Sequence, residues 1–188
     1  MSDFSRIGRI IAVVAGVVFL GLLLWIFGRA ALTDQSGGGV ISVNRPARSF
    51  SLKQVYGTQV TQEKHVSIEA LKGKKVILNF WAIWCETCRE EAKVLEAFWR
   101  GHKNSNIIVI GIAIDSREED VARFAAYYGK TYPLLLDQTG RVGVDYGITG
   151  VPETFYINEK GILVSKYVGS VSQEVLDGMI EGKSESAK

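Results

Sequence analysis

Residues 76–91 read Val-Ile-Leu-Asn-Phe-Trp-Ala-Ile-Trp-Cys-Glu-Thr-Cys-Arg-Glu-Glu, and they hold both cysteines of the chain. The apolar run from Val76 to Trp81 predicts a buried strand, and the residues after Cys88 have the apolar spacing of a helix. Unpaired N–H groups and the helix dipole at the start of that helix stabilise a thiolate at Cys85. Two cysteines separated by two residues can close a small disulfide ring and reopen it. The motif therefore indicates dithiol–disulfide exchange.

Two other uses of a cysteine pair are less consistent with this sequence. A zinc site usually takes four ligands, and the pair supplies two. The only histidines, His65 and His102, do not have a spacing that would complete the set. A purely structural disulfide across so short a loop removes little chain entropy from the unfolded state. The sequence thus predicts redox chemistry and no metal site.

The composition sets broad limits on the class of protein. The chain has 188 residues, enough for one ordinary domain with additional segments. Its net charge of +2 is small and evenly spread, so no nucleic-acid partner is expected. Two cysteines in a chain of this length do not make a disulfide scaffold. The compartment has to be inferred from the N-terminus.

Residues 10–27 form an uninterrupted run of uncharged, mostly apolar residues, preceded by Arg6 and Arg9. As a helix this run would span about 27 Å, close to the thickness of a bilayer's hydrocarbon core. Signal-peptide cores are shorter, although residues 28–30 could pass for a weak cleavage site, and a buried core helix would carry polar residues on one side. We predict an uncleaved anchor with residues 1–9 in the cytoplasm and the rest of the chain outside it.

The remaining domain boundaries follow from composition. Residues 28–45 include three consecutive glycines and predict a flexible linker. Residues 46–181 are the predicted folded domain, and the polar tail 182–188 is expected to fray. The full division is therefore a cytoplasmic N-terminus, a transmembrane anchor at 10–27, a linker, one domain and a tail.

Strand and helix signals alternate through the predicted domain. Strands are expected at 49–55, 76–81, 107–114, 133–137, 154–158 and 162–168, with 59–61 pairing back on the first. Helical segments are expected at 67–71, after the cysteines, at 117–129 behind a Ser116 cap, at 141–146, and from a Ser172 cap to Ile180. His65 is expected in an exposed loop without a role. This order predicts an α/β domain with a mixed sheet between helices.

The Trp-Cys-x-x-Cys motif between strand and helix, with a distant proline before a strand hairpin, resembles the thioredoxin fold. Within it, the chain is similar to the membrane-anchored CcmG/DsbE reductases of c-type cytochrome maturation and to the related ResA and TlpA proteins. The resemblance covers residues 46–181 and rests on residues 79–91, on residues 146–155 (Tyr-Gly-Ile-Thr-Gly-Val-Pro-Glu-Thr-Phe) and on the N-terminal anchor. It implies a thioredoxin-like fold with an N-terminal strand extension and a central βα insertion.

The two cysteines have different expected roles because of their positions. Cys85 is nearer the helix tip and should be the exposed attacking thiol. Cys88 lies one turn further in and should resolve the mixed disulfide by attacking Cys85. The Cys85–Cys88 disulfide is then the only redox group that the chain needs, and we expect no metal or organic cofactor.

Glu91 follows Cys88 on the face of the helix that also carries Leu95 and Phe98. Desolvation on an apolar face raises the pKa of a carboxyl group, so Glu91 could move protons to and from the thiols. The alternative is a solvated glutamate at the edge of this face. The resemblance implies the first interpretation, because CcmG and ResA proteins carry an active-site glutamate here. Asn79 stands where thioredoxins have a buried aspartate.

Glu86 and Trp84 flank Cys85 and could act on it or on its partner. A carboxylate between the cysteines disfavours the Cys85 thiolate and so favours a reductant, unless solvent screens it. CcmG proteins commonly have proline at the position of Glu86, which makes this chain closer to ResA here. Trp84 could be a platform for a partner peptide or could pack against the surface.

The resemblance implies that Pro152 is the cis-proline that faces the cysteines in thioredoxin folds. The backbone of Val151 would then be free to pair with an extended substrate strand. Glu153 could contribute to an acidic rim at the site or could be an ordinary surface residue of the strand. Trp84, Glu86, Val151 and Glu153 are therefore candidate substrate-binding residues.

Together these features predict a membrane-anchored thiol:disulfide oxidoreductase that works outside the cytoplasm in the reducing direction. The resemblance implies that it reduces the haem-binding C-x-x-C-H disulfide of apocytochrome c, directly or through a maturation partner. It also implies electron supply from a membrane thiol transporter of the DsbD/CcdA type. The alternatives are a TlpA-like reductase of other envelope thiols, such as those of copper-site assembly proteins, and a redox-inert binding or scaffold module.

Overall fold

The computed structural model describes residues 14–25 and 40–182. The chain separates into two units, Met1–Gly37 and Gly38–Lys188. In the first unit residues 14–25 are helical, with exposed apolar side chains such as Val17 and Phe19. No helix within residues 14–25 and 40–182 is both long and apolar enough to cross a membrane.

Several predicted segments lie partly or wholly outside the described residues. The predicted anchor, residues 10–27, extends beyond them at both ends, so it stays a prediction. The same holds for the cytoplasmic N-terminus at 1–9, for residues 28–39 of the linker and for residues 183–188 of the tail.

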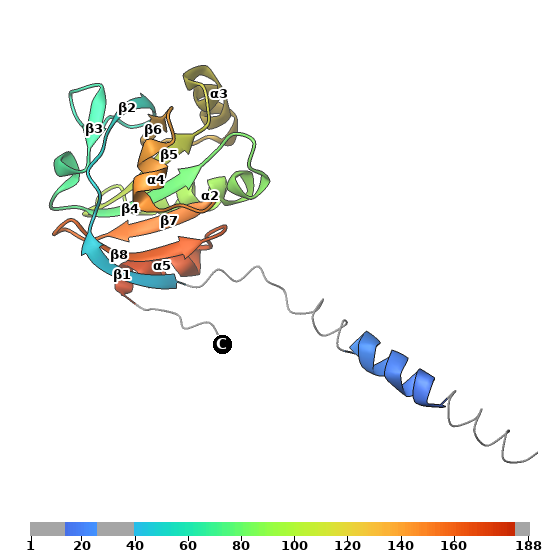
Figure 1. Ribbon diagram of the computed structural model, residues 1–188. Helices are drawn as coiled ribbons and strands as arrows, with labels where there is room; N and C mark the ends of the chain where they lie inside the picture. Colours follow the sequence, from blue (N-terminus) through green and yellow to red (C-terminus); the bar gives the residue numbers. More distant parts are fainter. Residues whose placement is uncertain (1–13, 26–39, 183–188) are drawn as a thin grey trace, which may run out of the picture. The chain divides into compact units, whose positions relative to one another are not determined.

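The second unit is a mixed eight-stranded sheet flanked by helices (Figure 1). Its strands are β1 (Val40–Pro46), β2 (Ser51–Tyr56), β3 (His65–Ser67), β4 (Lys75–Trp81), β5 (Ile107–Ile114), β6 (Leu134–Asp137), β7 (Glu153–Ile157) and β8 (Ile162–Val168). Its helices are η1 (Glu69–Leu71), α2 (Glu86–Gly101), α3 (Glu118–Tyr128), α4 (Arg141–Tyr146) and α5 (Gln173–Glu181). The strand order is β1-β8-β7-β4-β5-β6-β2-β3. The predicted thioredoxin-like fold is thereby confirmed.

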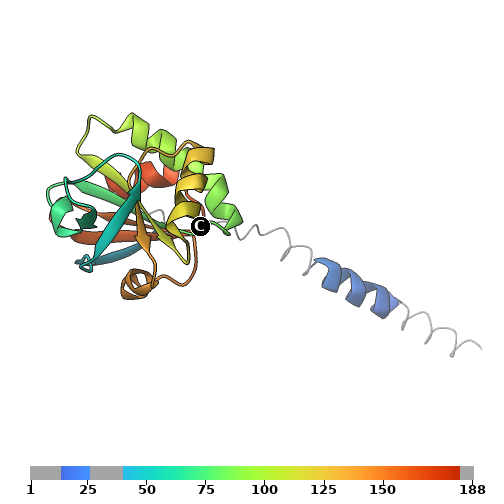
Figure 2. The same ribbon diagram turned by 90° about the horizontal axis from the view of Figure 1, so that it is seen from above.

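Strand β4 is central, and both of its faces are covered. It pairs in parallel with β5 and antiparallel with β7. On one face Trp81 contacts Phe124 of α3, with ring centroids 4.7 Å apart. On the other face Phe80 lies 5.5 Å from Tyr146 of α4, and Figure 2 shows α4 across the sheet from α2, α3 and α5. Because a strand buried on both sides needs apolar residues at every position, the run Val76–Trp81 contains few polar ones.

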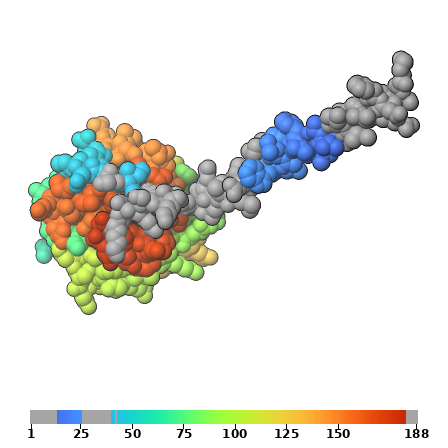
Figure 3. All heavy atoms as spheres, turned by 90° about the horizontal axis from the view of Figure 1, so that it is seen from below, coloured from blue at the N-terminus to red at the C-terminus, as the bar shows by residue number. Residues whose placement is uncertain are grey.

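Strand β1 corrects the predicted start of the domain. The predicted linker ran to residue 45, but residues 40–46 form a strand that pairs antiparallel with β8. Figure 3 shows this light-blue segment beside the orange and red C-terminal part of the domain. The neighbouring glycines suggested a flexible segment, whereas the unpaired edge of β8 supplies hydrogen-bond partners that composition does not reveal.

Three local predictions are also wrong. Strand β2 pairs with β3 on one side and with β6 on the other, and residues 59–61 belong instead to a loop. The side chain of Gln54 organises that loop, because its amide donates to three backbone carbonyl oxygens of residues 56–58. His65 is exposed as expected but lies in β3.

Helix α3 begins one residue later than predicted, with Arg117 as its N-cap. Ser116 does not cap it, because the Ser116 hydroxyl donates to Ile114 O, 2.7 Å away.

The other elements agree with the sequence patterns. Strand β5 and helix α4 have the predicted bounds. Ser172 caps α5, with its Oγ accepting a hydrogen bond from the backbone N–H of Val175 at 3.2 Å.

Gly111 in β5 provides a test of packing beside the site. A Cβ here would lie 2.6 Å from a buried methyl group of Leu134 and 3.1 Å from the Trp81 indole nitrogen. We expect Gly111→Ala to lower the free energy of unfolding by about 1–3 kcal/mol, measured by denaturant titration. Gly101→Ala is the control, since its Cβ would meet nothing within 4 Å. Equal stabilities for the two variants would contradict this packing.

Candidate active site

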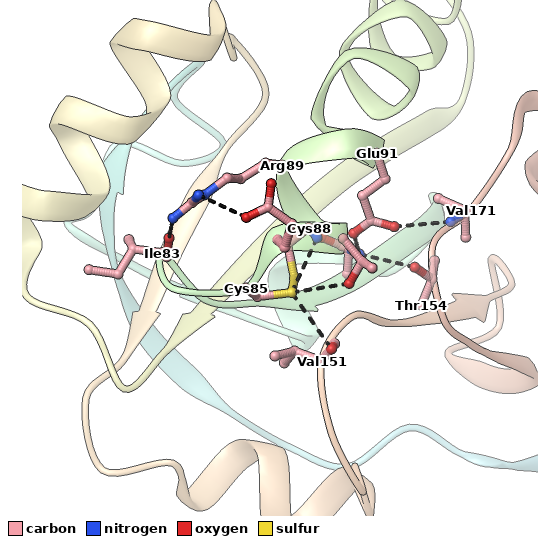
Figure 4. The surroundings of a disulfide bond; sticks show 11 residues. Ile83, Cys85, Cys88, Arg89, Glu91, Val151, Thr154 and Val171 are labelled. Carbon is pink, nitrogen blue, oxygen red and sulfur yellow. Dashed lines mark hydrogen bonds and ion pairs between the residues drawn. A yellow bond between two sulfur atoms is a disulfide. The ribbon is translucent and has the colours of Figure 1, made fainter. Parts of the chain in front are cut away.

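The two cysteines form a disulfide at the N-terminus of α2 (Figure 4). Cys85 is the N-cap residue, and its Sγ accepts a hydrogen bond from the backbone N–H of Cys88 at 3.1 Å. Strand β4 ends four residues before Cys85, so the sheet and the helix together fix the position of the pair. In the reduced state the same N–H group and the helix dipole would stabilise a Cys85 thiolate.

Cys85 is less exposed than predicted. It is 5% exposed and Cys88 is 1% exposed, so the pair is covered in the oxidised form. The cover over Cys85 includes the Thr87 hydroxyl at 3.4 Å and the carbonyl oxygen of Val151 at 3.6 Å from its Sγ. Cys85 is still the more accessible of the two cysteines, because Cys88 lies one turn deeper in the helix.

The segment before β7 faces the disulfide. The Val151–Pro152 peptide bond is cis, as the resemblance implies. Figure 4 shows the Val151 carbonyl directed at Cys85. Val151 is partly exposed and Pro152 is buried, so the backbone is presented at the surface while the proline ring is packed inside.

Glu153 corrects a prediction, because it lies inside the protein and forms no acidic rim. Its Oε1 accepts hydrogen bonds from the backbone N–H and the hydroxyl of Thr149, at 2.7 and 2.8 Å. Its Oε2 lies 2.7 Å from Nζ of Lys166 on β8. As the first residue of β7, Glu153 points into the space between these groups. Its role is to tie the segment around Pro152 to the sheet, since a buried charge needs partners.

Glu91 is the buried acid expected behind the cysteines. It is 1% exposed and lies one turn of α2 beyond Cys88. Its Oε1 accepts a hydrogen bond from the Asn79 side-chain amide at 2.9 Å, and its Oε2 accepts one from the Val171 N–H at 3.0 Å. Asn79 also donates to the Thr154 hydroxyl at 3.1 Å. The carboxyl group thus joins β4, α2 and the segment before α5.

Burial shifts the titration of Glu91 into the neutral range. Desolvation raises the pKa of Glu91 from 4.5 to about 7, although hydrogen bonds from Val171 and Asn79 and the charge of Lys130 lower it. A carboxyl group with this pKa can both accept and donate a proton near neutral pH. Such a group next to a dithiol is suited to acid–base work.

Glu86 and Trp84 lie on the exposed rim of the site. The Glu86 carboxylate forms an ion pair with Arg89, with 3.1 Å between the charged atoms, and Arg89 also donates to Ile83 O. Solvent and this cation weaken its effect on Cys85. Trp84 is 58% exposed, and its indole N–H donates to the Asp115 carboxylate at 3.2 Å. The exposed ring favours the partner-platform interpretation over surface packing.

Sequence reasoning missed Lys130. This residue connects α3 to β6 and is 2% exposed, with its Nζ 4.0 Å from the centre of a Trp81 ring. Burial lowers the pKa of Lys130 from 10.5 to about 7, against the charges of Glu91 and Glu96, which raise it. A single lysine between a helix and a strand gives no burial signal in the sequence. Within the described part of the chain, no cluster of three or more His, Cys, Asp and Glu residues could hold a metal ion.

Comparisons with known proteins agree with this geometry. The model of the AhpC/TSA family matches residues 43–166. The thioredoxin-like protein YneN of Bacillus subtilis is 33% identical over 143 residues, which are 75% of this chain and 80% of YneN. The thiol-disulfide oxidoreductase ResA of Bacillus anthracis is 29% identical over 141 residues, which are 75% of this chain and 78% of ResA.

A solved structure shares the fold. The crystal structure of a protein from Chlorobium tepidum, described as a putative thiol:disulfide interchange protein DsbE, superposes with a TM-score of 0.66. The match covers 74% of this chain and 96% of that one at 24% sequence identity.

The burial of Glu91 makes stability depend on pH. Its pKa is about 7 in the folded state and near 4.5 when solvated, so the folded state binds more protons between these values. Stability should fall as pH rises through this window. We expect Glu91→Gln to abolish this loss. The free energy of unfolding of the variant minus that of the unmodified protein should then increase by about 3 kcal/mol from pH 4.5 to above pH 7.

Denaturant unfolding of the oxidised protein at several pH values measures this effect. The exposed Glu90→Gln variant serves as the control and should follow the unmodified protein. Parallel pH curves for the Glu91→Gln variant and the unmodified protein would contradict a buried, titrating Glu91.

Proposed function

This chain belongs to the AhpC/TSA family. Because its relatives include proteins named thiol-disulfide oxidoreductases, we propose that it reduces disulfides outside the cytoplasm through Cys85 and Cys88. One observation carries the proposal: the Cys85–Cys88 disulfide is held at a helix N-terminus, between the cis-Pro152 segment and the buried Glu91. These parts supply a nucleophile, a docking edge and an acid–base group.

The first step is attack on the substrate disulfide by the Cys85 thiolate. A new sulfur–sulfur bond forms between Cys85 and the substrate, and the substrate disulfide breaks. The released substrate sulfur leaves as a thiolate and takes a proton. The N–H of Cys88 and the dipole of α2 favour the attacking thiolate, because both point at Cys85 Sγ.

The second step resolves the mixed disulfide. The Cys88 thiol gives its proton to the Glu91 carboxylate, and the Cys88 thiolate attacks Cys85 Sγ. The Cys85–Cys88 disulfide forms, and the second substrate sulfur leaves as a thiolate. Two electrons have then passed from the protein dithiol to the substrate. A membrane thiol transporter of the DsbD/CcdA type would return them, and no metal or organic cofactor takes part.

The reducing direction is supported by the charges near the pair. A protein becomes oxidising when its reduced thiolate is stabilised. The buried Glu91 opposes negative charge at the cysteines, because little solvent screens it. Glu86 contributes less, since it is exposed and paired with Arg89. The acid behind the disulfide therefore supports a reductant.

The docking surface suits an extended peptide. Val151 places its backbone over Cys85, where a substrate strand can pair with it. The exposed ring of Trp84, fixed by Asp115, can cover one side of such a peptide. The proposed substrate is the oxidised C-x-x-C-H segment of an apocytochrome c, or the disulfide of a protein that delivers it. Reduction would free both sulfurs for haem attachment.

Trapping identifies the substrate. In Cys88→Ser the mixed disulfide on Cys85 cannot be resolved, so substrate should accumulate as a covalent adduct separable by reduction. We expect apocytochrome c or its maturation partners in the adduct, identified by mass spectrometry. The Cys85→Ser and Cys88→Ser double variant should trap nothing.

The identity of the trapped protein decides between two reductase functions. Copper-site assembly proteins in the adduct, without cytochromes, would overturn the proposed substrate and favour the TlpA-like function. Equal trapping through Cys88 in a Cys85→Ser variant would contradict the proposed order of the cysteines.

The proposed location is the outer face of the cytoplasmic membrane, with a single span at residues 10–27 and the N-terminus inside. The described residues 14–25 of this span are helical and expose apolar side chains. We expect the full chain to stay in the membrane fraction after alkaline extraction and a chain that begins at residue 40 to be soluble. Release of the full chain by alkali would contradict the anchor.

A further inference from the structure

Lys130 is a buried amine that packs against aromatic rings. Its Nζ lies 4.0 Å from a Trp81 ring centre, 5.1 Å from that of Phe124 and 5.3 Å from that of Tyr132. It forms no ion pair with any carboxylate within residues 40–182. Aromatic faces stabilise an ammonium group but replace only part of its hydration. The amine is therefore poised between its charged and neutral forms.

Two carboxylates of α2 lie on the same side of β4 as this amine. Lys130 packs on Trp81, and Asn79, two residues earlier on the same face of β4, donates to Glu91. Thr131, next to Lys130, donates to Glu96, which is already compensated. Glu96 lies 2.6 Å from Arg100 and accepts hydrogen bonds from the Thr131 N–H and hydroxyl, both at 2.7 Å. Glu91 accepts hydrogen bonds only from the neutral groups of Asn79 and Val171. Lys130 is thus the cation that acts on Glu91, and Glu91 is the anion that acts most strongly on Lys130.

Lys130 is only 2% exposed, but it lines a hollow that opens to solvent. An open hollow of about 410 Å³ is lined by Tyr56, Gly57, Thr58, Lys130 and Thr131. Glu91 is 1% exposed and sits behind the disulfide. The titratable groups around the amine are Glu91, Glu96, the Tyr132 hydroxyl and Tyr56, and the hydroxyl of Tyr132 has no hydrogen-bond partner in the described structure.

We propose that Lys130 is a positioning residue for the proton step at Cys88: from its place over Trp81 it sets the charge of Glu91, and through the adjacent hollow it exchanges the proton with solvent. This inference rests on the proposed function. When Glu91 accepts the proton of Cys88, Lys130 loses the anion that holds its own proton and releases one to solvent. Ionised Glu91 with charged Lys130 has the same net charge as protonated Glu91 with neutral Lys130. The proton of Cys88 can therefore be passed on to solvent without a change of net charge at this site, while a substrate still covers Cys85.

Two neutral replacements test this role. In Lys130→Met and in Lys130→Gln the cation is lost, so the titration of the Glu91 carboxyl, followed by carbon-13 NMR of the oxidised protein, should move up by about one pH unit. The pH profile of mixed-disulfide resolution should move the same way. Both variants should shift the two profiles by the same amount, because both lack the charge, although Met is apolar and Gln is polar. Lys160→Met, in an exposed turn, should leave both profiles unchanged.

Unmoved Glu91 titrations in both Lys130 variants would overturn the inference, and so would shifts of opposite sign. A third measurement needs no Lys130 variant: in Glu91→Gln the titration of Lys130, followed through its carbon-13 Cε signal, should move to lower pH. An unchanged Lys130 titration would contradict the coupling.

The same data separate this inference from the proposed function. If Glu91→Gln removes the inflection of the resolution profile and the Lys130 variants leave it in place, only the role of Lys130 fails. If Glu91→Gln leaves the profile as it was, the proton role of Glu91 fails as well.

Discussion

The burial of one carboxyl group behind the disulfide is the constraint on which the rest of this site depends. Glu91 links α2 to β4 through Asn79 and to the segment before α5 through Val171. These neutral donors keep the group in place without cancelling its charge, so burial dominates its titration. A residue that holds three elements together is thereby also a proton acceptor beside a dithiol.

Two buried glutamates in this domain show how pairing decides their roles. Glu153 has an ion pair with Lys166 and two hydrogen bonds from Thr149, so its charge is compensated and it holds the segment around Pro152. In the described structure Glu91 forms no ion pair, and Lys130, the cation that acts on it, has no carboxylate partner either. The first arrangement stabilises a loop that faces the disulfide. The second keeps two protons available near neutral pH.

The sequence alone predicts the parts that depend on local pattern. The strand before Cys85, the helix after it and the buried face that carries Glu91 follow from apolar spacing, because both faces of β4 and one face of α2 are covered. Burial set by distant segments was not predictable. Glu153 is enclosed by Thr149 and by a lysine of the next strand, and Lys130 is enclosed by aromatic rings from other elements. In both cases the residues that bury the side chain come from other segments of the chain, so the local sequence pattern does not reveal them.

The central claim is that Glu91 exchanges a proton when the Cys85–Cys88 disulfide changes its redox state. The most direct measurement is a reduced-minus-oxidised infrared difference spectrum at pH 7, where the Glu91 carboxyl is partly ionised. Placing thiols and thiolate beside the group should raise its protonation. The account predicts a carboxylic-acid band that grows on reduction and is absent from Glu91→Gln. Identical spectra of the two proteins would contradict it.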